Sequence, residues 1–122
     1  MLPLLEKVKS AYLLWFGYYL ALPKAHRHSL GQRIDTAFIN LIEIIAVATF
    51  LPKDEKSGPV RQTIGRADTL KVLLMVLWES KSLDSRKYAA LSVRLEEIGR
   101  MLGGWSGQLR KQNSPAARPG EK

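Results

Sequence analysis

The chain of 122 residues contains no cysteine, which excludes disulfides, thiolate catalysis and cysteine-ligated zinc. It also lacks a glycine-rich phosphate loop, an HExxH motif, an EF-hand loop and the Glu-x-x-His pairs of di-iron bundles. Its two histidines, His26 and His28, could supply two metal ligands, but no further histidine or cysteine can complete such a site. Catalytic motifs are therefore mostly absent, and we expect no metal or cofactor.

Long apolar runs are also missing. Residues 11–22 look like a signal-peptide core, but Glu6 lies in the preceding region and no small-x-small cleavage site follows. Residues 37–51 are interrupted by Asn40 and Glu43 and are shorter than the roughly 20 apolar residues of a membrane span. We expect a cytoplasmic protein that does not cross a membrane. Glu43 could be a perturbed acid, but its spacing from Asn40 favours a polar pair at an interface or a hydrogen bond between helices.

Acidic residues are scarce: 11 Asp and Glu stand against 19 Lys and Arg, for a net charge of +8. Such an excess suits a polyanionic partner, and its spread along the chain suits contacts with phosphates rather than with bases. Any single cation could simply lie on a solvated helix surface. The overall excess of positive charge favours binding to nucleic acid instead. The predicted nucleic-acid-binding residues are Lys24, Arg27, Arg33, Arg61, Arg66, Arg86, Lys87, Arg94, Arg100, Arg110 and Lys111.

Apolar residues recur at steps of three and four in four segments, and no strand-like alternation is evident. This pattern predicts an all-α, antiparallel up-down four-helix bundle with helices over residues 3–22, 29–51, 59–81 and 84–111. The bundle forms one domain over residues 1–112, and the tail over residues 113–122 should be disordered in isolation. The predicted core contains Tyr12, Trp15, Phe38, Leu41, Leu74, Leu77, Leu95 and Leu102.

Boundary residues support these helices. Pro3 suits a helix start, whereas Pro23 and Pro52 should end the first and second helices. Ser29, with Gln32 three residues later, predicts a capping box at the start of the second helix.

The segment IGRMLGGWSGQLRKQ, residues 98–112, is unusually rich in glycine for a helix. The apolar stripe nevertheless keeps its phase to residue 109, so we expect the helix to continue rather than to be capped near Gly103. Gly99, Gly103 and Gly107 then form a row beside the core, where another helix or another subunit could approach closely. The second helix carries a further set of apolar residues outside its stripe, which also suggests subunit contact.

The same glycine-rich segment, together with ALPKAHRHSLGQRIDTAFINLIEIIAVA and ADTLKVLLMVLW, resembles the accessory variability determinant (Avd) proteins of diversity-generating retroelements. The resemblance covers most of residues 12–112, and GRMLGGW and the turn at Pro23 and Lys24 are its most specific parts. It implies a non-enzymatic bundle that forms a homopentameric barrel. It also implies binding to the element's reverse transcriptase, its template RNA and its cDNA, in support of mutagenic reverse transcription and retrohoming.

Two other classes remain open. A protein of the type encoded in intervening sequences of 23S ribosomal RNA belongs to the same wider group and would share this fold and charge. An amphipathic protein of the membrane surface would also place basic residues beside aromatic ones.

Overall fold

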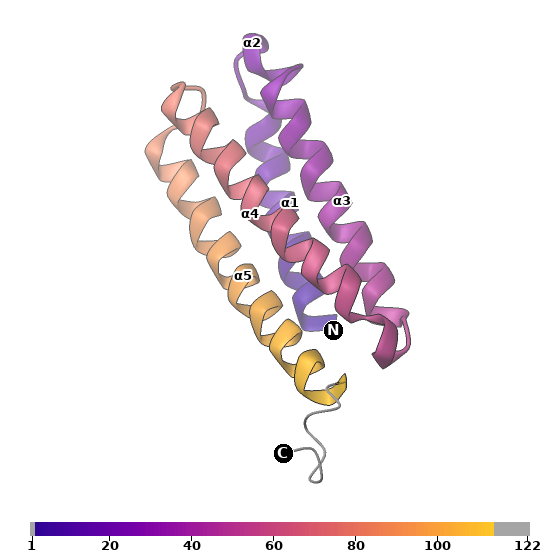
Figure 1. The fold of residues 1–122 in the computed structure, drawn as a ribbon. Helices are drawn as coiled ribbons and strands as arrows, with labels where there is room; N and C mark the ends of the chain where they lie inside the picture. Colours follow the sequence, from indigo (N-terminus) through magenta and orange to yellow (C-terminus); the bar gives the residue numbers. More distant parts are fainter. Residues whose placement is uncertain (1, 114–122) are drawn as a thin grey trace, which may run out of the picture.

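The computed structural model describes residues 2–113. Its elements are α1 (Leu2–Leu20), α2 (Lys24–Arg27), α3 (Leu30–Phe50), the short 3-10 helix η1 (Lys53–Glu55), α4 (Ser57–Glu79) and α5 (Ser85–Asn113). The four long helices run alternately up and down (Figure 1). α1 packs against α3 and α5, and α4 packs against the same two helices from the other side. The predicted all-α bundle is confirmed, with no strand in the described part.

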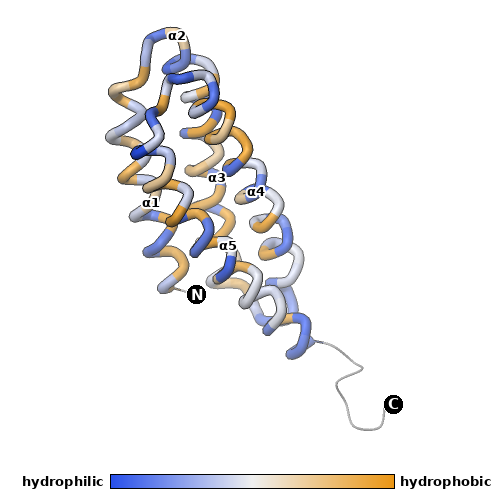
Figure 2. The backbone as a smooth tube through the Cα atoms, turned by 90° about the vertical axis from the view of Figure 1, so that its left-hand side faces the viewer, coloured by the Kyte–Doolittle hydropathy of each residue, from blue (hydrophilic) through white to orange (hydrophobic). Residues whose placement is uncertain are grey.

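The core forms where the apolar stripes of the four long helices meet. Figure 2 shows hydrophobic and hydrophilic positions interleaved along each helix, as expected when one face is buried and the other is exposed. All predicted core residues are buried except Tyr12, which is half buried at the edge of the core. Its position one residue beyond the buried Ala11 places Tyr12 on the side of α1 that faces α3.

An aromatic cluster joins α1 to α3. Trp15 stacks on Phe38, and its indole Nε1 donates a hydrogen bond to Asp35 Oδ1 at 3.2 Å. Tyr12 packs edge-on against Phe38. Burial raises the pKa of Tyr12 to about 12, and a hydrogen bond to Asp35 and its negative charge add to the rise. One half-buried carboxylate therefore satisfies the polar atoms of two aromatic side chains.

The helix boundaries agree with the prediction to within about two residues, but the connections contain two short helices that were not predicted. Pro23 and Pro52 lie just beyond α1 and α3, as expected, and each is the residue that precedes a short helix. The predicted capping box is wrong. No side chain caps α3, because the Ser29 hydroxyl instead donates to the Ala25 carbonyl of α2 at 3.0 Å.

The glycine-rich segment is helical throughout, because α5 runs on to Asn113 and buries Trp105 and Leu109 beyond the glycines. The predicted continuation is therefore confirmed, and capping at Gly103 is wrong. The first residue of the predicted tail, Asn113, belongs to α5. The rest of that tail, residues 114–122, lies outside the described residues.

Close packing fixes the end of the bundle that carries α2. Gly31 is buried at the start of α3, and a Cβ atom there would lie 2.8 Å from the His26 carbonyl oxygen and 2.8 Å from Leu22 Cδ1. His26 Nδ1 in turn lies 2.5 Å from Ser82 Oγ in the connection between α4 and α5. The two connections at this end of the bundle are therefore joined directly to each other.

A lysine organises the opposite end. Lys56 Nζ donates to the carbonyls of Ala48 and Thr49, at 2.7 and 2.8 Å, in the last turn of α3. The same ammonium group lies 5.9 Å from the centre of the Trp105 ring. Cations are favoured at helix C-termini and over indole faces, so Lys56 ties α3 to the glycine-rich part of α5.

Candidate nucleic-acid interface

Most of the predicted nucleic-acid-binding residues are exposed. Lys24 lies on α2, Arg33 on α3, Arg61 and Arg66 on α4, and Arg86, Arg94, Arg100, Arg110 and Lys111 on α5. They occupy several faces and both ends of the bundle, so the structure does not gather them into one patch.

Within residues 2–113, none of these cations forms an ion pair with a carboxylate. The ion pairs in this range use other lysines: Lys7 with Glu97, Lys9 with Glu6, and Lys71 with Asp68 and Glu96. The positive charge of the predicted residues therefore stays available to a partner. Paired and unpaired cations could not be told apart from the sequence, because ion pairing depends on which helices are neighbours.

Three of the predicted residues have contacts within the chain. Arg27 is half buried, and its Nη2 donates to the Leu22 carbonyl at 3.1 Å, so it supports the turn between α1 and α2. Lys87 lies over the ring of Tyr18, 5.3 Å from its centre, and Arg94 donates to Ser10 Oγ at 2.9 Å. The contacts of Lys87 and Arg94 do not pair their charges with a carboxylate, and Arg27 and Lys87 are both half buried.

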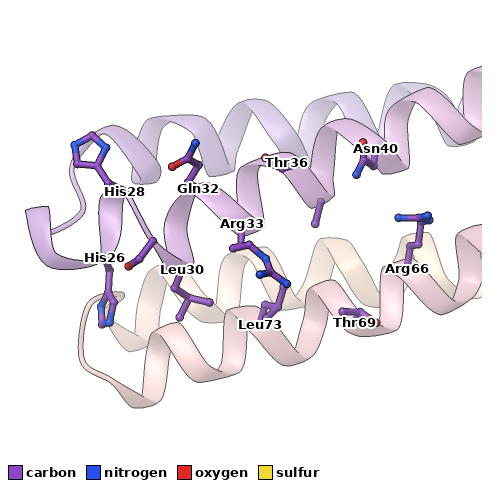
Figure 3. A pocket seen from close by; sticks show the side chains of 12 residues that line it. His26, His28, Leu30, Gln32, Arg33, Thr36, Asn40, Arg66, Thr69 and Leu73 are labelled. Atoms are coloured by element: carbon purple, nitrogen blue, oxygen red, sulfur yellow. The ribbon is translucent and has the colours of Figure 1, made fainter.

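Arg33 and Arg66 are brought together from two different helices. They line a groove between α3 and α4 of about 1050 Å³, and Figure 3 shows both side chains reaching into the space between the helices. The other polar residues of the groove are amides, hydroxyls and histidines, and none of the carboxylates among residues 2–113 lines it. The polar side chains are His26, His28, Ser29, Gln32, Thr36, Asn40 and Thr69.

The glycine row lies on the outer side of α5 and is open. A Cβ atom at Gly103 would have no neighbour within 4 Å, and one at Gly99 would lie 3.3 Å from Lys71 Nζ. At Gly107 the nearest atom, 3.9 Å away, belongs to the side chain of Arg110. Within residues 2–113, α4 reaches the row at Gly99 through the side chain of Lys71, and no backbone of another helix lies within 4 Å of the added Cβ atoms. A contact of the row with another subunit remains a prediction.

Apolar side chains on α1 and α3 are exposed in the single chain. Leu13, Phe16 and Leu20 are exposed on α1, and Ile39 and Phe50 are exposed on α3. The second apolar set of this helix is Ala37, Ile39, Ile42, Ile44, Val47 and Phe50. Of this set, Ile39, Val47 and Phe50 are exposed in the single chain, whereas Ala37 and Ile42 pack against the core. Of the predicted polar pair on the same helix, Asn40 is half buried and Glu43 is exposed.

The described residues contain neither a metal-binding cluster nor a helix that could cross a membrane. Within residues 2–113, no three His, Asp or Glu side chains lie close enough together to hold a metal ion. None of the helices in that range combines the length and hydrophobicity that a membrane crossing requires.

Together these features define a basic four-helix bundle with unpaired surface cations. A family profile described as bAvd-like matches residues 5–109, and the chain belongs to this family. Membership agrees with the resemblance to accessory variability determinant proteins and indicates an accessory protein of a diversity-generating retroelement. Such accessory proteins are generally non-catalytic. Searches against curated proteins and against solved structures found no match to the chain.

Proposed function

We propose that this protein binds the template RNA and cDNA of a diversity-generating retroelement and docks the element's reverse transcriptase, without a catalytic residue of its own. Family membership supports the retroelement setting. The observation that carries nucleic-acid binding is that exposed arginines such as Arg61, Arg86 and Arg100 have no carboxylate partner within the described residues, whereas Lys7, Lys9 and Lys71 have one.

We further propose that copies of the chain associate, as the pentamer of the resemblance implies. The exposed apolar side chains of α1 and α3 are the physical support, because a soluble monomer rarely exposes a large contiguous apolar patch. Association also multiplies the charge of +8 by the number of copies, which strengthens attraction to a polyanion. Light scattering at micromolar concentration tests this, and a stable monomer would contradict it.

Two triple variants of equal charge test nucleic-acid binding. In the first, Arg61, Arg86 and Arg100 are changed to glutamine; in the second, Lys7, Lys9 and Lys71 are changed to glutamine. We expect the first variant to bind a short RNA more weakly and to lower the slope of log affinity against log salt by about 2, as for three lost phosphate contacts on a single strand. The second variant should keep most of the slope, because its lysines are paired in the folded chain.

Equal losses in the two triple variants would show that net charge alone governs binding. Insensitivity of the unmodified protein to salt between about 50 and 200 mM would contradict the electrostatic mechanism altogether. Co-purification with the reverse transcriptase encoded by the same retroelement tests the proposed docking of that enzyme. If the transcriptase does not associate while RNA still binds, the alternative of a protein linked to a ribosomal RNA intervening sequence is favoured.

A further inference from the structure

The α3–α4 groove holds two like charges without a counter-charge. Arg33 projects from α3 and Arg66 from α4 into the groove, Arg33 beside Leu73 and Arg66 farther along near Asn40 (Figure 3), and no acidic residue among residues 2–113 lines it. Each of these cations attracts an anion, and no opposite charge of the groove lining competes for it. Because a guanidinium donates through a planar fork, this pair suits an oxyanion such as phosphate better than it suits a spherical ion.

The other residues that line the groove offer more contacts than the binding of a single phosphate group requires. Gln32 and Asn40 offer amides that both donate and accept hydrogen bonds, and Thr36 and Thr69 offer hydroxyl groups. Leu73 adds an apolar surface. Amides and hydroxyls are side chains that bind base edges, while apolar surfaces accept the faces of bases.

The groove is also longer than a single phosphate. Its lining residues on α3 run from Leu30 to Asn40, which is about 15 Å at a rise of 1.5 Å per residue. A short stretch of a strand fits such a length. A double helix does not present the same groups, because its base edges are paired and an intact duplex offers mainly phosphates and sugars to a groove on a helix surface.

We propose that the α3–α4 groove binds an unpaired RNA strand, with Arg33 and Arg66 holding its phosphates and Gln32 and Asn40 contacting its exposed bases. This inference rests on the proposed nucleic-acid binding and deepens it, because it assigns a preference for single strands to one surface. The other exposed cations, which stand apart from this groove, then add attraction without distinguishing single from double strands.

Fluorescence anisotropy with a short unstructured RNA and with its blunt duplex tests the groove. The variant Arg33→Gln, Arg66→Gln is compared with the control Arg61→Gln, Arg100→Gln, which removes the same charge from exposed positions outside the groove. We expect the groove variant to lose about ten-fold or more in affinity for the single strand, the scale of a lost charged hydrogen bond. Its loss on the duplex should equal that of the control, and circular dichroism should show both variants fully helical.

A variant that leaves the net charge unchanged separates the effect of hydrogen bonding from the effect of charge. Gln32→Ala combined with Asn40→Ala leaves the net charge unchanged, so we expect weaker binding to the single strand and unchanged binding to the duplex. If groove and control variants weaken both RNAs equally, the groove assignment is wrong while nucleic-acid binding stands. If the unmodified protein binds neither RNA, the proposed function itself fails. If the groove variant keeps both RNAs but loses the reverse transcriptase, the groove is a protein-binding surface and the inference is overturned.

Discussion

Gly31 is the glycine on which the fold depends most directly, and Gly31→Ala is the sharpest test of the packing at the α2 end. A Cβ atom at this position would lie 2.8 Å from the His26 carbonyl oxygen, 2.8 Å from Leu22 Cδ1 and 3.2 Å from Tyr19 Cε1. The leucine methyl group can rotate away, but the His26 carbonyl belongs to the backbone of α2. The added methyl group must therefore displace α2 relative to α3.

The expected cost follows from two opposing effects. Overpacking a closely packed site costs about 1 to 3 kcal/mol. Replacing a helical glycine by alanine returns up to about 1 kcal/mol in conformational entropy. We therefore expect a net loss of about 1 to 2 kcal/mol in the free energy of unfolding, which for a chain of this size lowers the melting temperature by about 5 °C.

Urea unfolding followed by circular dichroism measures this loss, and Gly103→Ala is the matched control. Gly103 also lies inside a helix, but a Cβ atom there has open space, so alanine should stabilise the single chain by about 0.5 to 1 kcal/mol. The two substitutions add the same methyl group and should change stability in opposite directions. A Gly31→Ala variant as stable as the unmodified protein would refute the packing described for α2 and α3.

Three further substitutions probe single contacts. Lys56→Met keeps the side-chain stem but removes the donor to the last turn of α3, and should lower the free energy of unfolding by about 1 to 2 kcal/mol in urea; no change would show that water replaces the ammonium group. Asp35→Ala leaves the buried indole of Trp15 without an acceptor and should cost about 1 to 3 kcal/mol, whereas Asp35→Asn, which retains an acceptor oxygen, should cost less. Because the pKa of Tyr12 is raised from 10.0 to about 12, the folded state holds this proton more tightly than the unfolded state. The associated stability is present below pH 10 and is lost as the pH rises to about 12, so Tyr12→Phe should reduce the difference in urea midpoint between these pH values.

The long helices were predictable because each combines an apolar period with proline or polar breaks at its ends. The short helices α2 and η1 were not, because segments of four and three residues are too short to show a period. The capping box predicted at Ser29 was wrong for a related reason. The spacing of Ser29 from Gln32 fits a capping box, but the presence of α2 just before it offers the hydroxyl another acceptor.

The candidate site was predictable residue by residue but not as an arrangement. Arg33 and Arg66 were each predicted from charge. That both line one groove depends on the register of α3 against α4, which no local sequence pattern specifies. Lys56 and Gly31 were not singled out, because a lysine in a polar break and a glycine near a helix start are ordinary in sequence. Their importance comes from the atoms that surround them in the folded chain.

The end of α5 has partners different from those of its middle. Beyond Gly103 and Gly104, Trp105 lies against the ammonium group of Lys56, and Asn113 Nδ2 donates to the Lys53 carbonyl at 3.1 Å. Both anchors belong to the connection between α3 and α4, and the glycines before them are the positions where a helix rotates most freely. Opening of the last turns of α5 therefore requires the loss of both contacts with this connection and the exposure of Trp105 and Leu109.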